Sequence, residues 1–168
     1  KDVYRLNTIA NRFSKIGSLP ELKKLEVVSV TKSAYEYLES RSSKQISFTF
    51  ESSEEILYCN LNEELYGWVI ENLIKNAIDA MLGKGELSVH IESDAKRVKI
   101  NITDTGKGMA KSQFKRIFKP GFTTKKRGWG LGLSLSRRII EDYHRGKIFV
   151  KKSEIDKGTT FQVVLDKL

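Results

Sequence analysis

The chain has 168 residues, 39% of them hydrophobic and 30% charged, which is typical of one soluble globular domain with or without an appendage. It has no apolar run near the roughly 18 residues that a membrane span requires and no signal-peptide pattern, so membrane spanning and export of this piece by itself are excluded. The single cysteine, Cys59, excludes an internal disulfide, suits a reducing compartment and lies in an apolar run that predicts a buried thiol.

The positive charge is concentrated in one segment. The net charge is +9, but residues 105–140 hold ten Lys or Arg and no Asp or Glu, while the rest of the chain nets −1. A local positive field of this kind indicates an anionic ligand, for which nucleotide phosphates, a nucleic acid and an acidic partner protein are all candidates.

The first 17 residues carry apolar side chains at helical spacing, and residues 17–20 (GSLP) predict the end of that helix. A lone helix of this length is marginal in water, so we expect it to pair with a segment upstream. The chain also opens in mid-pattern without a cap, which indicates a fragment. We therefore divide the chain into a helical piece, residues 1–20, and a domain, residues 21–168.

The domain alternates between strands and helices. A helix ending near Ser40 follows an extended piece at residues 25–28; Ser29 or Thr31 would cap it, and Tyr37 is expected to face inward. The strands are predicted at residues 46–50, 56–59, 87–92, 98–103, 147–152 and 159–165. Further helices are predicted from a cap at Asn60 or Asn62 to Met81, at 111–118 and at 131–143. Mostly joined as hairpins, these elements predict an α+β two-layer sandwich with helices on one face of a mixed, mostly antiparallel sheet.

The helix that ends at Met81 has an unusual polar face. Leu65, Trp68, Asn72, Asn76 and Asp79 share one side, because gaps of three and four residues nearly close a helical turn. Asn and Asp are mediocre helix formers, so propensity does not explain them there. The face is either solvated or supplies oxygen ligands to a hard cation, and this helix alone leaves both readings open.

Two glycine-rich segments follow. Asp104 stands at a strand end before Gly106 and Gly108; a buried carboxylate needs a donor, such as the exocyclic amine of adenine, and the glycines let the backbone approach a ring closely. Residues 128–132 (GWGLG) run into a helix whose first N–H groups favour a phosphate. Their spacing matches neither a P-loop nor a Rossmann fingerprint.

These segments, in this order, resemble a known family. Residues 71–81 (ENLIKNAIDAM), 104–109 (DTGKGM), 117–125 (IFKPGFTTK) and 128–140 (GWGLGLSLSRRII) look like the N, G1, F and G2 boxes of sensor histidine kinases. That family shares the Bergerat ATP-binding fold with gyrase B, Hsp90 and MutL. The NAIDAM ending is similar to nitrogen-regulation-type sensors, and residues 1–20 resemble the second helix of a dimerisation and phosphoacceptor hairpin.

The resemblance implies a role for each matching residue. Asn76 would bind Mg²⁺ with Asn72 beside it, Asp104 would hold the adenine amine of ATP, and Phe118 and Phe122 would anchor a lid. The remaining nucleotide-binding residues would be Asp79, Gly106, Gly108, Thr123, Thr124, Lys125, Gly128, Gly130, Leu131, Gly132 and Thr159.

Two departures from the family pattern bear on the chemistry. Gyrase-type relatives have a water-activating Glu where this chain has Asn72, and the nearest carboxylate, Glu71, lies about 100° round the helix. This favours transfer to an acceptor over hydrolysis, with Asn72, Asn76 and Glu71 as the candidate catalytic residues. Asp79 also stands where many histidine kinases have a Lys, so no phosphate contact is expected from it.

The function implied is transfer of the ATP γ-phosphoryl group to a histidine upstream of this fragment, and then to an aspartate of a response regulator receiver domain. Neither His90 nor His144 has the helical setting of a phosphoacceptor; we expect His90 in the sheet and His144 solvated or facing a helix dipole. The parent would be a homodimer in the cytoplasm, as a free protein or as the cytoplasmic part of a membrane-anchored sensor.

The alternative is a regulatory or protein-interaction module of the same superfamily without kinase activity. An anti-sigma type of serine kinase fits the appended helix poorly. Nucleic acid is not expected as a partner, because the excess charge coincides with the phosphate-binding segment and no basic strand is interleaved with aromatics.

Overall fold

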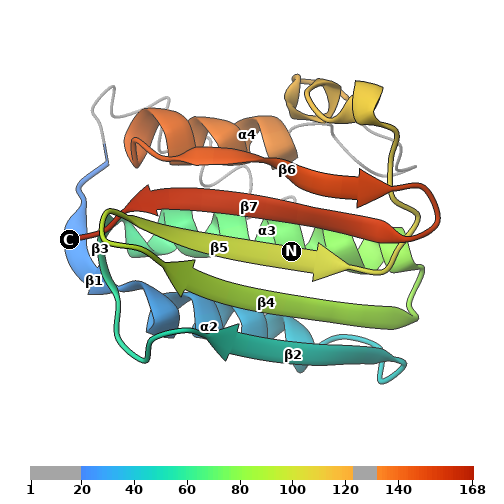
Figure 1. Ribbon diagram of the computed structural model, residues 1–168, viewed down its shortest axis with the longest axis horizontal. Helices are drawn as coiled ribbons and strands as arrows, with labels where there is room; N and C mark the ends of the chain where they lie inside the picture. Colours follow the sequence, from blue (N-terminus) through green and yellow to red (C-terminus); the bar gives the residue numbers. More distant parts are fainter. Residues whose placement is uncertain (1–19, 123–131) are drawn as a thin grey trace.

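A computed structural model describes residues 20–122 and 132–168. Its main sheet has the strand order β2-β4-β5-β7-β6, in which β2 and β4 are parallel and every other neighbouring pair is antiparallel (Figure 1). The strands are β2 (Ile46–Ser52), β4 (Gly85–Ser93), β5 (Arg97–Asp104), β6 (Lys147–Glu154) and β7 (Gly158–Asp166). The predicted mixed, mostly antiparallel sheet is therefore confirmed.

The helices form the second layer. In Figure 1, α2 (Val27–Glu39), α3 (Glu63–Met81) and α4 (Gly132–Arg138) all lie behind the sheet, and none of the described helices covers its other face. The core lies between the layers, and Leu73 and Ile74 of α3 and Ile100 of β5 are fully buried in it. Helices on one face of the sheet were predicted, and the two-layer sandwich is confirmed.

One predicted hairpin is wrong. The strands expected at residues 46–50 and 56–59 lie in different sheets, because β3 (Tyr58–Leu61) pairs antiparallel with β1 (Lys23–Glu26) in a small sheet of their own. Buried Cys59 and Leu61 give β3 its inward row, and exposed residues alternate with them. Burial raises the pKa of the Cys59 thiol to about 12, which agrees with the expected buried cysteine.

The start of α2 also differs from its prediction. Glu26 caps the helix instead of Ser29 or Thr31: its carboxylate accepts the N–H of Val28 at 2.8 Å and that of Ser29 at 3.1 Å. A Glu cap works here because the same carboxylate accepts the N–H of Leu57 at 3.1 Å, a contact from 31 residues away. This bond joins α2 to the segment before β3, which no local pattern indicates.

The inward face of α2 is rotated from the expected one. Tyr35 is buried and Tyr37 is 43% exposed, so the prediction that Tyr37 faces inward is wrong. The Tyr35 ring packs on Phe48 and Phe50 of β2, with ring centroids 5.8 and 5.2 Å apart. Thr31 is buried as well, and its hydroxyl bonds to the Tyr66 hydroxyl of α3 at 2.6 Å.

Two predicted helices are irregular. The helix expected at residues 111–118 is a pair of short 3₁₀ helices, η1 (Lys111–Gln113) and η2 (Arg116–Phe118). The helix expected at residues 131–143 is α-helical in α4 and continues as a π-helix, η3 (Ile139–Tyr143). Arg145 then turns with a positive φ of 55°, and Gly146 donates its N–H to Ile140 O at 2.8 Å.

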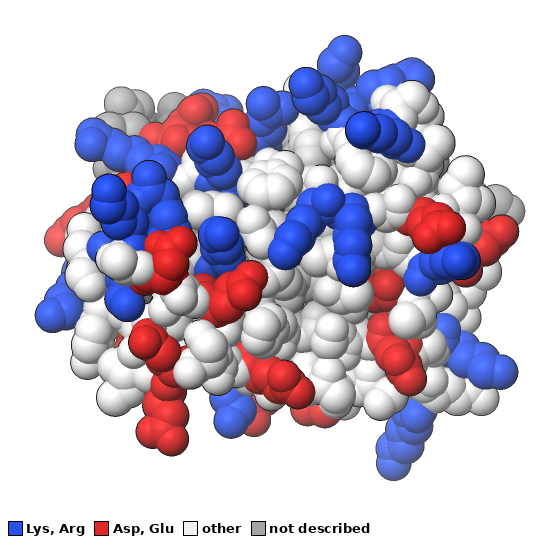
Figure 2. All heavy atoms as spheres, in the orientation of Figure 1, with Lys and Arg blue, Asp and Glu red and all other residues white. Residues whose placement is uncertain are grey.

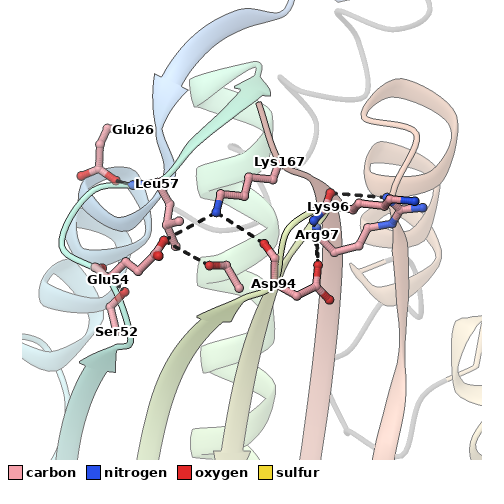
Figure 3. Close-up of polar contacts among 9 residues, drawn as sticks. Glu26, Ser52, Glu54, Leu57, Asp94, Lys96, Arg97 and Lys167 are labelled. Carbon is pink, nitrogen blue, oxygen red and sulfur yellow. Dashed lines mark hydrogen bonds and ion pairs between the residues drawn. The ribbon is translucent and has the colours of Figure 1, made fainter.

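The end of the sheet where β5 begins is closed by polar contacts (Figure 3). The Lys167 ammonium group donates to Asp94 O at 3.4 Å and lies 3.8 Å from the Glu54 carboxylate, and Ser93 donates its hydroxyl to that carboxylate at 3.1 Å. These residues join the chain end to two loops. Within residues 20–122 and 132–168, no helix combines the length and apolar character that crossing a bilayer requires.

Candidate functional site

The polar face of α3 begins from a well-defined helix start. Asn62 caps the helix, and its side-chain oxygen accepts the N–H of Leu65 at 3.0 Å. Three turns further along, Asn72 and Asn76 are half-buried, whereas Asp79 is exposed. The expected row of two amides and a carboxylate therefore runs from the protein interior to solvent.

The orientation of the Asn72 amide is determined by its neighbours on α4. The Ser136 hydroxyl donates to Gly132 O at 2.7 Å, so toward Asn72 it acts as an acceptor. Asn72 Nδ2 therefore donates to Ser136 Oγ at 3.1 Å, which directs Oδ1 of the amide elsewhere. A Cβ added to Gly132 would lie 2.7 Å from Asn72 Oδ1, so any larger residue at that position would displace the Asn72 amide.

Sequence reasoning missed Ser136. It is fully buried, and it stands one helical turn after Gly132 in a motif where only the glycines were considered. A small polar residue four positions after a helix-opening glycine was the available signal.

The pleat of β5 explains why Asp104 points into the helical layer. Val98, Ile100 and Ile102 are buried at alternate positions, and Asp104 is the next residue in the same inward row. Its cross-strand partner on β7 is Thr159, which is also buried. The structure thus brings together Asp104 and Thr159, which are 55 positions apart in the sequence, as the predicted site requires.

The environment of Asp104 destabilises its charge. Asp104 is 3% exposed, and this burial raises the pKa of its carboxyl group above the ordinary value of 3.8. The backbone N–H groups of Gly106, at 2.8 Å, and of Thr159 act in the opposite direction and only partly offset that effect. Such a carboxylate retains acceptor capacity for a ligand that carries an N–H donor.

Glycines allow the backbone around Asp104 to pack closely. A Cβ on Gly106 would lie 2.5 Å from Ala80 O of α3, and one on Gly108, where φ is +66°, would lie 2.0 Å from Glu154 O. The same turn is held by the Lys107 N–H, which donates to Ala80 O at 3.0 Å. The last turn of α3 and the turn after β5 are therefore in direct contact, as expected of one pocket wall.

Ser153 is a second residue that sequence reasoning missed. Its Oγ lies 2.7 Å from Thr159 Oγ1 and accepts the N–H of Met109 at 2.8 Å, so it joins β6, β7 and the turn after Gly108. Ser153 stands opposite Thr159 in the β6–β7 register. A hydroxyl pair in register becomes visible only after the pairing of the two strands is known.

The predicted aromatic anchors, Phe118 and Phe122, lie at the end of the described range that stops at residue 122. Phe118 is 5% exposed and packs edge-on against Phe161 of β7, with ring centroids 6.2 Å apart. Phe122 is half-buried, and the Arg116 guanidinium lies 5.9 Å from its ring. The predicted phosphate contacts Thr123, Thr124, Lys125, Gly128, Gly130 and Leu131 lie outside the described residues.

The side-chain oxygens of α3 suit a Mg²⁺ ion that is shared with phosphate groups better than a metal ion that protein side chains alone would hold. The described residues contain no group of three or more His, Cys, Asp or Glu placed to hold a metal ion. Mg²⁺ is commonly held by one or two protein oxygens together with phosphate oxygens and water. Asn76, with Asn72 one turn away, offers side-chain oxygens of that type on the helix whose last turn contacts the turn after Asp104. Glu71 is buried at 7% exposure on a different side of α3.

The two histidines have different settings. His90 is exposed on β4, on the sheet face that the helices leave open, as expected for a strand residue. His144 is buried at the end of η3, so of the two expected settings the solvated one is wrong and the one at a helix end is found. Its Nε2 accepts the N–H of Asn62 at 3.0 Å and its Nδ1 lies 2.9 Å from Ile139 O, which indicates a neutral ring that carries its proton on Nδ1. Burial lowers the pKa of His144 from its ordinary value of 6.5.

Comparisons with known proteins agree on one family. Residues 62–168 match the family model described as histidine kinase-, DNA gyrase B-, and HSP90-like ATPase. The chain is 35% identical over 170 aligned residues to the sensor histidine kinase ZraS of Salmonella typhimurium, an alignment that covers 98% of this chain and 36% of that protein. It is 43% identical over 110 residues to sporulation kinase E of Bacillus subtilis, covering 65% of this chain and 14% of the kinase.

Solved structures agree with these relatives. The catalytic domain of the histidine kinase ThkA is similar to this chain with a TM-score of 0.80 and 32% identity, over 88% of this chain and 97% of that one. ThkA in complex with the response regulator TrrA matches with a TM-score of 0.81 and 30% identity, over 99% of this chain and 48% of ThkA. The chain thus spans about a third or less of the curated kinases named above.

Proposed function

The chain belongs to the histidine kinase-, DNA gyrase B-, and HSP90-like ATPase family, and we propose that it is the catalytic domain of a sensor histidine kinase. In this proposal it binds Mg·ATP and transfers the γ-phosphoryl group to a histidine outside the chain, from which a response regulator receives it. The observation that carries the proposal is Asp104, a desolvated carboxylate at a strand end, followed by a turn that contacts the last turn of α3 at Ala80.

The residues of this chain would act mainly by positioning. Asp104 would accept a hydrogen bond from the adenine amine, with Gly106 and Gly108 keeping the backbone close to the ring. Asn76 and Asn72 would hold Mg²⁺, which neutralises charge on the phosphates. Gly132 begins α4 beside Asn72, so phosphates bound there would lie near the metal.

Transfer is favoured over hydrolysis. Asn72 is an amide that donates its Nδ2 to Ser136, and an amide cannot take a proton from water as a carboxylate can. Glu71 is buried at a different angle on the helix. With an amide at position 72 in place of a carboxylate, the bound nucleotide would persist until an acceptor arrives.

The proposal extends to the protein of which this chain would be a part. Residues 1–20 would belong to the second helix of a dimerisation hairpin, residues 21–168 would form the catalytic domain, and the parent would be a homodimer that faces the cytoplasm. Similarity to ThkA over 99% of this chain supports the first assignment. His144 is buried with both ring nitrogens bonded, which supports an acceptor histidine outside this chain.

A Mg·ATP titration of the wild-type chain and its variants tests the site. We expect the wild-type chain to bind with micromolar affinity and both Asn76→Ala and Asp104→Ala to weaken binding by about tenfold or more, because each loses a hydrogen bond or a metal ligand. Asn60→Ala is the matched control, since Asn60 is exposed on β3 and belongs to no part of the pocket. Equal affinity in all four proteins would reject the site.

A phosphorylation assay separates the kinase from a regulatory module. With γ-³²P-ATP, the 168-residue chain alone should incorporate no acid-labile phosphate, whereas a longer parent that carries the hairpin should do so and should lose the label in its Asn76→Ala form. ATP binding with no transfer in the longer parent would favour the regulatory module. Stoichiometric labelling of the chain alone would contradict the proposed acceptor.

A further inference from the structure

An open groove lies beside α4. Its volume is about 480 Å³, and its walls come from the η1–η2 segment, from α4 and η3, and from the start of β6. Ser136 of α4 contacts Asn72 in the nucleotide pocket, whereas the next residue, Arg137, lines the groove. Because consecutive residues of a helix lie about 100° apart, the groove is on a different side of α4 from the contact with Asn72, although Phe118 lines the groove as well.

The groove is basic. Lys115, Arg137 and Lys147 line it, and Glu141 is the one acidic residue among its lining. Arg137 Nε donates to the Glu141 carboxylate at 3.1 Å, so this acid is already paired. Figure 2 shows further Lys and Arg side chains, with no acidic ones among them, above η1 and η2 at the upper edge of the molecule.

Apolar surface and an open strand edge accompany this charge. Phe149 is 36% exposed and Phe114 half-buried, and both line the groove. Among the strands that the structure describes, β6 is the last in the sheet and pairs only with β7. The other edge of β6 leaves backbone N–H and C=O groups unpaired with any described strand, which is the requirement for adding an extended segment.

We propose that this groove binds a short acidic segment of a partner protein. Carboxylates of that segment pair with Lys115 and Lys147, one aromatic or aliphatic side chain packs on Phe149, and the backbone runs beside the edge of β6. Charge complementarity decides the occupant, because three cations with one paired acid disfavour a basic or neutral segment. An open strand edge favours a peptide over a nucleic acid, because a nucleic acid has no peptide N–H and C=O groups to pair with the strand.

The probe is a fluorescein-labelled dodecapeptide of Asp and Glu around one central Phe, titrated with the full chain and followed by anisotropy. We expect saturable binding with a micromolar Kd. Reversing both charges, Lys115→Glu with Lys147→Glu, should weaken binding by about tenfold or more, because two attractions become repulsions. Phe149→Ala should weaken it by about fivefold, since it removes the apolar contact.

The matched control reverses two exposed lysines elsewhere, Lys32→Glu with Lys44→Glu, and changes the net charge by the same amount. The proposal is overturned if the control weakens peptide binding as much as the groove variant, if no saturation is reached at millimolar protein, or if a single-stranded oligo-dT binds more tightly and displaces the peptide. Mg·ATP affinity should stay unchanged in both double variants, so failure here is distinguishable from failure of the proposed function.

Discussion

Two aspartates at opposite ends of β5 show how burial changes the behaviour of one side chain. Asp94 precedes the strand, and its Oδ1 accepts the N–H groups of Lys96 and Arg97, each at 2.8 Å. Asp104 ends the strand and accepts the N–H of Gly106 at 2.8 Å. Backbone hydrogen bonds lower the pKa of exposed Asp94, whereas burial outweighs the same kind of bond and raises the pKa of Asp104.

The difference teaches which end of the sheet is structural and which is suited to a ligand. At the Asp94 end the carboxylates are hydrated or paired, as Glu54 is with Lys167, so the turn and the chain end are stabilised without a ligand. At the Asp104 end a charge is kept out of water with incomplete compensation. Natural proteins retain such a group where a binding partner supplies the missing donor.

The largest expected effect comes from closing the space at the Asp104 end. Gly158→Ala would place a Cβ 2.0 Å from Asp104 O at a φ of +120°, so we expect a loss of about 3 kcal/mol or more in the free energy of unfolding, measured with urea. Gly67→Ala is the control, because a Cβ added to Gly67 would meet no heavy atom within 4 Å. Since Gly67 lies inside α3, this substitution should raise the free energy of unfolding by about 0.5 kcal/mol or more. Similar effects of the two substitutions would refute the close packing.

Next in size is the separation of binding from stability. Asp104→Asn should weaken Mg·ATP binding by about tenfold or more, yet leave the ligand-free protein as stable as the wild type or more stable near neutral pH, because it removes a desolvated charge. Asp94→Asn should do the reverse, with unchanged ATP affinity and lower stability. Calorimetric titration measures the ATP affinity of both variants, and urea unfolding measures their stability. If both substitutions changed affinity and stability in the same way, the proposed difference between the two aspartates would be rejected.

The pH dependence of the same two variants has opposite signs. The contribution of Asp104 to stability is fully present below its ordinary pKa of 3.8 and is lost as pH rises through the raised folded value. The contribution of Asp94 is present above 3.8 and is lost as pH falls through its lowered folded value. Both variants should therefore approach the wild-type stability in acid, Asp104→Asn from above and Asp94→Asn from below.

His144 and His90 repeat the contrast between buried and exposed groups. Because burial lowers the folded pKa of His144 below 6.5, its contribution is present above 6.5 and is lost as pH falls, when the unfolded chain takes up a proton first. Stability should thus fall as the pH is lowered below 6.5 in the wild type and in His90→Gln. A His144→Gln variant that keeps the same slope would contradict this assignment.

The smallest effect is expected at the exposed end of β5. Arg97 and Asp166 form an ion pair at 3.2 Å with side chains 49% and 68% exposed. Water and salt screen such a pair, so Asp166→Asn should change the free energy of unfolding by less than about 0.5 kcal/mol. A larger loss, measured by the same urea titration, would show that the ion pair between Arg97 and Asp166 contributes substantially to stability despite its exposure.

Much of the fold and of the candidate site could be predicted from local patterns. Period-two alternation placed Asp104 at a strand end, helical spacing put Asn72 and Asn76 on one face, and the order of the motifs indicated an ATP-binding domain. The family comparison confirms that last expectation. These features can be predicted because a repeat of 2 or 3.6 residues, or a glycine turn, depends only on residues that are close together in the sequence.

Contacts between distant segments could not be predicted in the same way. The parallel pairing of β2 with β4, the Glu26 cap that also binds Leu57, and the Ser136 hydroxyl that orients Asn72 each join residues far apart in the chain. No local pattern selects among the many such partners. Packing of the whole core selects them together.

The sequence by itself determined which residues could form a nucleotide site and in which order they occur. Only the tertiary structure decided how they act, because burial depends on everything packed around a group. Asp94 and Asp104 are alike in sequence, each at an end of a strand, and their pKa values move in opposite directions once the helices cover one of them. His144, expected either in water or facing a helix dipole, is buried, and its pKa is lowered for the same reason.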